Sequence, residues 1–255
     1  MNEQLPEFFY EIFDASLPKL GPGDDASTQK ALKTILDSNV SLGAPDTRIL
    51  DLGCGTGAQT IQLALSLDTE ILVVDNHQPY LNELNRRASE LGLSKKIRTR
   101  LGDMKDLGFE DGSFDLIWSE GALYAMGFAN GLAMCHRLLV PGGCLAVTEL
   151  CWLKGYAPEE CRAYFEQEYP PMVDVDTNLA TIVSRGYDML GHFTLPECSW
   201  LEQYYEPLEA RLSDLRARYT ADPGSLEIIE TIQREIDIYR EYSSYYGYEF
   251  FMMKR

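Results

Sequence analysis

The amino-acid sequence predicts an α/β fold built on a doubly wound, mostly parallel sheet. Between residues 48 and 150, short apolar runs alternate with helical stretches of ten or more residues, which is the pattern of consecutive βαβ units. The runs lack a regular polar alternation, as strands do when helices cover both faces of their sheet. The first run also ends in a glycine-rich turn that leads into a helix, which is typical of the first unit of such folds.

Five apolar runs in this stretch are the predicted parallel strands. The helix after the second run has Pro79 near its first turn, and Glu83 precedes Arg87 by four residues, a spacing that stabilises helices. Another helix is expected over residues 130–139, and the turn at residues 141–143 (Pro-Gly-Gly) leads from it into the fifth strand. The predicted strands are residues 48–52, 70–75, 97–101, 114–119 and 144–150.

The residues before this core predict a helical cover. Helices are expected over residues 7–17 and 25–38, separated by Gly21-Pro22-Gly23. Residues 1–47 therefore form an N-terminal helical cover over the sheet, and residues 48–150 form the core.

The residues after the core complete one domain of 255 residues. In the C-terminal part, residues 151–255, two strand-like runs at 189–195 and 246–253 bracket a helical stretch over about residues 200–242. This part holds twelve of the fifteen tyrosines. Tyrosine suits half-buried positions, so they either pack helices together or line an aromatic substrate pocket. We place the substrate wall here, because the parts outside the sheet are where α/β proteins vary what they bind.

The charge of the chain excludes several classes of partner. Lys and Arg number 22 and Asp and Glu number 40, giving a formal net charge of −18. Phosphate backbones and anionic membranes repel such a surface, so we expect no nucleic acid and no membrane as partner. The one dense basic patch (Lys95, Lys96, Arg98, Arg100) is expected to protect an edge strand.

Cellular location and metal content follow from other features of the composition. The six cysteines form no CxxC pair and have no histidine at zinc-ligand spacing, so no metal site is predicted. No apolar run approaches the roughly 20 residues of a membrane span, and the acidic start of the chain is not a secretory signal. We therefore expect a cytoplasmic protein, and one that can form a homodimer.

The strongest local motif is the turn Asp51-Leu52-Gly53-Cys54-Gly55-Thr56-Gly57. Gly53, Gly55 and Gly57 let the backbone turn sharply and let a ligand approach the main chain. The helix that follows offers free N–H groups to a polar ligand. The turn alone is ambiguous, because with Ala58 it also fits the spacing of a dinucleotide site.

Acidic residues near the ends of the first three strands favour a different nucleoside ligand. Asp51 suits a ligand ammonium better than a pyrophosphate, and Asp75 can accept hydrogen bonds from both hydroxyls of a ribose. Asp103 and Met104 follow the third strand, where a carboxylate beside a soft apolar side chain suits the amino edge and face of an adenine.

These residues resemble the class I S-adenosylmethionine-dependent methyltransferases over about residues 48–150. LDLGCGTG (50–57), VVD (73–75), GDM (102–104), FDLIWSEGALY (114–124) and LLVPGGCLAV (138–147) are similar to the ordered motifs of that family. SEGALY (119–124), the upstream GPG (21–23) and the YGY near the C-terminus (246–248) also resemble a bacterial subgroup of small-molecule methyltransferases.

The resemblance implies S-adenosyl-L-methionine as cofactor and a seven-stranded Rossmann-like sheet whose last strand is antiparallel. The two C-terminal runs would be its sixth and seventh strands, with the helical insertion between them. By the same resemblance the glycines of the turn hold the methionyl part, Asp51 assists its amino group, Asp75 binds ribose, and Asp103 and Met104 bind adenine. Ser119 and Glu120 would line the floor where the methionyl group meets the substrate. Asn76 departs from the family, which more often has an apolar residue there.

The predicted function is transfer of a methyl group to a small-molecule acceptor by in-line displacement. Such a reaction mainly requires alignment, with a general base only for an acceptor that arrives protonated. Glu120 and Tyr124 are the predicted catalytic residues, and Glu149, His77 and His192 are further side chains that could reach the donor. Two alternatives stay open: an NAD-type oxidoreductase on the same glycine turn, and a protein that binds S-adenosylmethionine without turnover.

Overall fold

The computed structural model describes residues 7–38, 42 and 46–255, and an eight-stranded sheet forms its centre. The strands are β1 (Ile49–Leu52), β2 (Ile71–Asp75), β3 (Ile97–Leu101), β4 (Phe114–Ser119), β5 (Leu139–Trp152), β6 (Val173–Asp174), β7 (Asp188–Thr194) and β8 (Tyr246–Lys254). Their order is β3-β2-β1-β4-β5-β8-β7, with β6 paired to β5 outside this path. β8 is antiparallel to β5 and β7, and the other pairings are parallel.

This topology confirms the predicted mostly parallel sheet with an antiparallel last strand. The predicted number of seven strands was wrong by one, because the two-residue β6 pairs beside β5 and is too short to leave a periodic pattern. β3 lies at an edge of the sheet, as the basic patch predicted.

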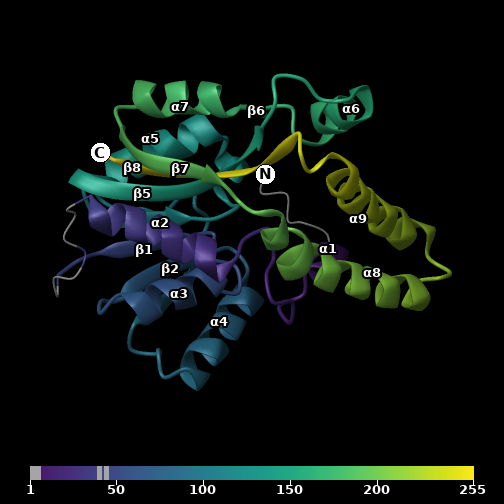
Figure 1. The fold of residues 1–255 in the computed structure, drawn as a ribbon. Coiled ribbons are helices and arrows are strands. Elements are labelled where there is room, and N and C mark those ends of the chain that lie inside the picture. The colour runs from purple at the N-terminus through teal and green to yellow at the C-terminus, as the bar shows by residue number, and fades with distance from the viewer. Residues whose placement is uncertain (1–6, 39–41, 43–45) are drawn as a thin grey trace.

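Helices cover both faces of the sheet and one of its ends (Figure 1). They are α1 (Glu7–Ile12), α2 (Asp25–Asp37), α3 (Ala58–Ser66), α4 (Gln78–Glu90), α5 (Phe128–Leu138), α6 (Glu159–Glu168), α7 (Val175–Ser184), α8 (Glu206–Arg218) and α9 (Pro223–Tyr242). α2, α3 and α4 pack on one face, and α5 and α7 pack on the other. α1, α6, α8 and α9 share a third apolar cluster beyond the sheet, at the right in Figure 1.

Alternate side chains of the central strands serve the two main cores. Trp118 of β4 and Phe250 of β8 lie in the first cluster, and their neighbours Ile117 and Phe251 lie in the second. All four are fully buried. Apolar residues on both faces are the reason that these strands read as continuous apolar runs.

Most predicted elements are confirmed, with informative differences at their ends. The helix predicted over residues 7–17 ends at Ile12, because Asp14 Oδ1 accepts hydrogen bonds from the backbone N–H and hydroxyl of Ser16 and so forms a turn. The fifth strand starts at Leu139, before the predicted turn, because Leu139 already pairs with Phe114 ahead of a bulge. Helices α6 and α7 were not predicted.

The C-terminal runs form β7 and β8, and α8 and α9 fill the insertion between them, as the resemblance implied. The predicted N-terminal cover includes residues 1–6, 39–41 and 43–45, which lie outside the described residues.

Candidate functional site

The three predicted acidic residues gather at one edge of the sheet. β1, β2 and β3 are adjacent and parallel, so their carboxyl ends meet at the same edge. Asp51 lies in β1, Asp75 ends β2, and Asp103 follows β3. The sequence therefore placed its three acidic candidates together beside the glycine-rich turn. The carboxyl ends of β1, β2 and β3, with these residues, are called the rim below.

The glycine-rich turn has a backbone that only glycine accommodates well. The φ angles of Gly53 and Gly57 are +68° and +80°. A Cβ atom at Gly53 would lie 2.3 Å from the Cβ of Ala122, and one at Gly57 would lie 2.1 Å from Leu84 Cδ1. These glycines therefore allow the turn to pack tightly against the loop that follows β4 and against α4.

Asp75 holds the turn in place from the neighbouring strand. Its Oδ2 accepts a hydrogen bond from the Gly55 N–H at 2.9 Å, and its Oδ1 accepts one from the His77 N–H at 2.9 Å. Burial raises the pKa of Asp75, although these backbone donors act against that rise. The ribose role of Asp75 stays a prediction.

Asp51 lies in β1, directly before the glycines of the turn, and is fully buried. Its oxygens accept hydrogen bonds from the Thr60 hydroxyl at 2.5 Å and from Gln59 Nε2 at 3.4 Å. Burial raises the pKa of Asp51 to about 7, against the opposing effect of Thr60. Gln59 Nε2 also donates to the Cys54 carbonyl of the turn, so Gln59 links Asp51 to the turn. The contact of Asp51 with a ligand amino group stays a prediction.

Met104 and Asp103 lie differently relative to the turn. Met104 Cε lies 3.3 Å from the position that a Cβ of Gly53 would take, so this side chain borders the turn. Asp103 Oδ1 accepts a hydrogen bond from the Lys105 N–H, and its adenine role stays a prediction.

Ser119 and Glu120, which follow each other at the end of β4, have different surroundings. Ser119 is fully buried and donates its hydroxyl hydrogen to the Leu52 carbonyl, so it ties β4 to β1. Glu120 Oε1 accepts hydrogen bonds from the Thr28 hydroxyl and Trp118 Nε1, each at 2.8 Å. Burial raises the pKa of Glu120, and the nearby Lys19 acts against this rise more strongly than any other group.

A segment between α1 and α2 closes over the glycine-rich turn and forms a cavity with it. The cavity measures about 100 Å³. One wall is the turn with the start of α3, the opposite wall is Lys19, Leu20, Gly21 and Pro22, and Glu120 and Gly121 close one side.

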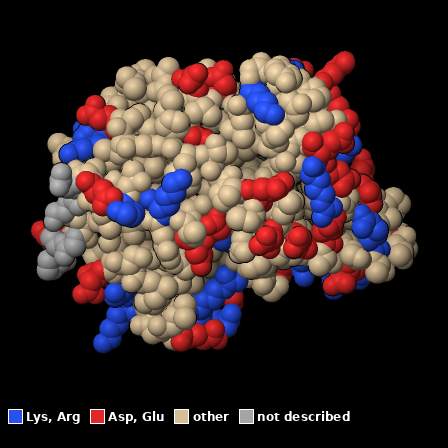
Figure 2. All heavy atoms as spheres, in the orientation of Figure 1, with Lys and Arg blue, Asp and Glu red and all other residues tan. Residues whose placement is uncertain are grey.

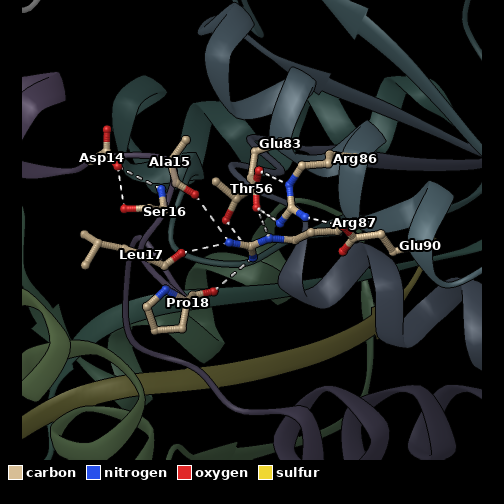
Figure 3. Close-up of polar contacts among 10 residues, drawn as sticks. All are labelled: Asp14, Ala15, Ser16, Leu17, Pro18, Thr56, Glu83, Arg86, Arg87 and Glu90. Carbon is tan, nitrogen blue, oxygen red and sulfur yellow. Dashed lines mark hydrogen bonds and ion pairs between the residues drawn. The ribbon is translucent and has the colours of Figure 1, made fainter.

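Arg87 of α4 fastens this segment to the turn (Figure 3). Its guanidinium is held at 2.7 Å by Glu83. From there it donates hydrogen bonds at 3.0 to 3.4 Å to the carbonyls of Ala15, Leu17 and Pro18 and to the Thr56 hydroxyl. Hydrogen bonds from Arg86 and Arg87 lower the pKa of Glu83 to about 2, so Glu83 stays ionised.

Tyr124 lies in the short helical turn that follows Glu120 and Gly121, over residues 123–126. Its side chain is exposed and meets the Tyr169 ring edge to face at 6.4 Å. The Tyr169 hydroxyl donates to Glu149 Oε1 at 2.5 Å. Glu149 follows the β5 residues that pair with the end of β4, and burial raises its pKa to about 7. The two predicted catalytic residues therefore have different partners: Glu120 contacts Thr28 and Trp118, whereas Tyr124 packs on Tyr169, which is bonded to Glu149.

The two histidines considered as further candidates have other partners. His77 stacks on Tyr10 with ring centroids 3.7 Å apart, and burial lowers its pKa. His192 lies in β7, and its Nδ1 is 2.5 Å from Oε1 of Glu249 in the neighbouring strand β8.

Sequence reasoning missed the residues that reach the site from outside the core. Lys19 and Leu20 stand in a loop without periodicity, and Arg87 carried only the signal of an ordinary helix pair with Glu83. The motif Gly21-Pro22-Gly23 was the one available signal, because it marks a tight turn close to an aspartate that caps α2.

Comparison with known proteins identifies the family. Residues 49–143 match a family model described as a methyltransferase domain. The chain is 30% identical over 163 residues to the O-methyltransferase rstn1 of Aspergillus nomiae, a match that covers 60% of this chain and 70% of that protein. It is 25% identical over 175 residues to the sterol 24-C-methyltransferase erg-4 of Neurospora crassa, covering 66% of this chain and 46% of that protein. The chain thus spans about half the length of the sterol methyltransferases that it matches.

A solved structure shares the whole fold. The crystal structure of a SAM-dependent methyltransferase from Geobacter sulfurreducens in complex with S-adenosyl-L-homocysteine has a TM-score of 0.80 to this chain. The match covers 99% of each chain at 21% sequence identity. With the glycine-rich turn and the acidic rim in the arrangement described above, these matches show that the chain belongs to the class I S-adenosylmethionine-dependent methyltransferase family.

Proposed function

We propose that this protein binds S-adenosylmethionine at the carboxyl edge of β1, β2 and β3 and transfers its methyl group to a small-molecule acceptor. The observation that carries the proposal is the cavity between the glycine-rich turn and the segment at residues 19–22. Glycines in its walls let a ligand come close to the main chain, and the walls also contain one lysine and one glutamate. This combination suits the zwitterionic amino-acid end of that cofactor.

The residues along the rim fit the rest of the cofactor. In the proposal Asp75 accepts hydrogen bonds from the ribose, and Met104 with Asp103 contacts the adenine. When bound, S-adenosylmethionine supplies an already activated methyl group. The task of the protein is then alignment, which can contribute roughly 7–11 kcal/mol to lowering a barrier.

The acceptor side is proposed to be the wall formed by Tyr124, Tyr169 and Glu149. Glu149 is buried, and its pKa of about 7 lets it accept a proton near neutral pH if the acceptor arrives protonated. Tyr124 is exposed beside it and can contact the acceptor directly. We expect Tyr124→Phe to reduce turnover more than cofactor affinity, whereas Tyr156→Phe, at another exposed tyrosine, leaves both unchanged.

A small metabolite suits this surface better than a nucleic acid. On the face drawn in Figure 2, acidic side chains gather toward α8 and α9, and basic ones are interspersed with acidic ones. The net charge of −18 also disfavours binding of a nucleic acid, because its phosphate backbone is negative as well. Within the described ranges, the helices include none with the length and apolar character needed to cross a bilayer.

Two measurements test the proposed function. Isothermal calorimetry with S-adenosylhomocysteine should show binding to the wild type, weaker binding to Asp75→Ala, and unchanged binding to the surface variant Asp37→Ala. Incubation with a methyl-labelled donor and a metabolite extract should then give a labelled small molecule together with S-adenosylhomocysteine.

The alternatives give different results in the same assays. An oxidoreductase would change NADH fluorescence and would not bind S-adenosylhomocysteine. A protein that only binds the cofactor would bind S-adenosylhomocysteine but release none from the labelled donor with any acceptor. The homodimer and the cytoplasmic location stay predictions, to be checked by sedimentation and by cell fractionation.

A further inference from the structure

Glu235 of α9 is a carboxylate with bonding capacity left beside the third apolar cluster. It is partly buried. Its Oε1 accepts a hydrogen bond from the Tyr205 hydroxyl at 2.9 Å, whereas none of the hydrogen bonds and ion pairs among the described residues involves its Oε2. Burial raises the pKa of Glu235 against the effect of Tyr205, and the charge of Glu168 raises it further. A positive group beside Oε2 would offset both of these effects.

Tyrosines surround this carboxylate and connect it to the acceptor wall. After burial itself, the charge of Glu235 is the largest cause that raises the pKa of five tyrosines, so all five lie near it. One of them is Tyr124 of the acceptor wall. The acceptor wall therefore continues toward Glu235. The five are Tyr124, Tyr164, Tyr204, Tyr205 and Tyr246.

Tyr248 links the same cluster to the cofactor side. Its hydroxyl lies 3.8 Å from the position that a Cβ of Gly121 would take, and Gly121 lines the cavity at the glycine-rich turn. The Tyr248 ring stacks on Trp200 with centroids 5.2 Å apart, and Trp200 stacks on Tyr239 of α9 at 4.4 Å. A continuous set of aromatic side chains thus runs from the cofactor side to α9.

Two polar atoms of this aromatic set have no partner. Among the described residues, the buried side-chain atoms without a hydrogen bond are the Tyr246 hydroxyl and Trp200 Nε1. These residues are 1% and 3% exposed, and their rings meet edge to face. A buried polar atom without a partner is costly, and a tyrosine hydroxyl can accept a hydrogen bond from an N–H group. The set therefore has bonding capacity left for a polar ligand near Glu235.

A cleft between α6 and α9 opens beside this region. It measures about 560 Å³, within the roughly 300–1,000 Å³ of pockets that hold small molecules. Tyr164 and Glu168, which both interact electrostatically with Glu235, line it. Its lining contains four glutamates and one arginine, and this Arg234 pairs with Glu160. The cleft is therefore acidic and favours a cation over an anion.

We propose that the acceptor carries an ammonium group, which pairs with Glu235 and lies against the surrounding tyrosine rings. The face of a tyrosine ring attracts a cation within about 6 Å of its centroid, and a carboxylate adds a charge-assisted hydrogen bond. This inference rests on the proposed function and deepens it, because it names amines as the acceptor class. A neutral or anionic acceptor would gain nothing from Glu235.

The test compares three probes of similar size and different charge: benzylammonium, benzyl alcohol and benzoate. Calorimetric titrations near neutral pH use the full chain saturated with S-adenosylhomocysteine. Benzylammonium should bind about tenfold more tightly than benzyl alcohol, and benzoate should bind more weakly than either. Glu235→Gln should weaken binding of benzylammonium about tenfold and change binding of benzyl alcohol less than about twofold.

The matched control is Glu241→Gln, which removes the same charge from an exposed position of α9 and should change neither affinity. Thermal unfolding should show Glu235→Gln to be as stable as the wild type, because its amide oxygen can still accept the hydrogen bond from Tyr205. The labelled product from the metabolite extract should bind to a cation exchanger at neutral pH.

The outcomes separate this inference from the proposed function. Wild-type protein that binds S-adenosylhomocysteine but shows no preference for benzylammonium would overturn the amine assignment alone. An equal loss in Glu241→Gln, or a neutral or anionic labelled product, would also overturn it. Failure of the wild type to bind S-adenosylhomocysteine would overturn the proposed function itself.

Discussion

Replacing Arg87 by methionine should release the segment that closes the cavity. The side chain is 18% exposed and donates to three carbonyls of that segment and to Thr56 of the glycine-rich turn (Figure 3). Methionine keeps most of the apolar length of the side chain but none of these donors.

The size of the effect follows from the geometry. The hydrogen bond to Leu17 is 3.0 Å long, and those to Ala15, Pro18 and Thr56 are 3.3 to 3.4 Å. A good hydrogen bond from a charged group contributes about 1.5–3 kcal/mol, and long ones contribute less. We therefore expect the docking of the segment to lose about 2–3 kcal/mol, which makes local opening roughly 30- to 150-fold more frequent.

Hydrogen exchange read by mass spectrometry is the appropriate assay. The Gly23 N–H donates to the Ser199 carbonyl at 3.1 Å, so exchange of the peptide over residues 14–24 reports on opening. Arg86→Met is the matched control, because Arg86 pairs with the same Glu83 and is 55% exposed but does not reach the segment. Unchanged exchange in Arg87→Met, or an equal rise in Arg86→Met, would show that Arg87 does not hold the segment in place.

Three further predictions concern the turn, the rim and the acceptor wall. Gly57→Ala should destabilise the fold by about 2–4 kcal/mol in urea unfolding, because the φ of this residue is +80° and the new Cβ would collide with Leu84. Gly92→Ala is the control: its φ is +71° but its new Cβ would meet no other atom within 4 Å, so it should cost about 1 kcal/mol. Equal losses in the two variants would contradict the packing argument. Asp75→Ala should lower cofactor affinity by about 1.5–3 kcal/mol by calorimetry, and an unchanged affinity would remove Asp75 from the site. Burial raises the pKa of Glu149 to about 7, so the folded state keeps a proton that the unfolded state loses near pH 4.5, and stability falls as pH rises through 7. Glu149→Gln should abolish up to about 3 kcal/mol of that fall in urea titrations between pH 4.5 and 8, and parallel pH profiles of the two proteins would show that Glu149 is ionised throughout.

Local sequence patterns were enough to predict the core of the fold and the acidic residues at the carboxyl ends of its strands. Apolar runs, helix boundary signals and the glycine-rich turn are local patterns, and the strands and helices that they predicted between residues 48 and 150 are present with end shifts of a few residues at most sites. Consecutive parallel strands end at the same edge of a sheet, so Asp51, Asp75 and Asp103 could be placed together before their strand order was known.

The closure of the site became visible only in the folded structure. Lys19 faces Glu120, and Arg87 reaches the carbonyls of residues 15–18, through contacts between segments far apart in the chain. It also brought Tyr169 against Tyr124 and bonded Tyr169 to Glu149. Loops carry no periodic pattern, and their final path depends on the sum of many distant contacts, which is why a local reading of the sequence could not place them.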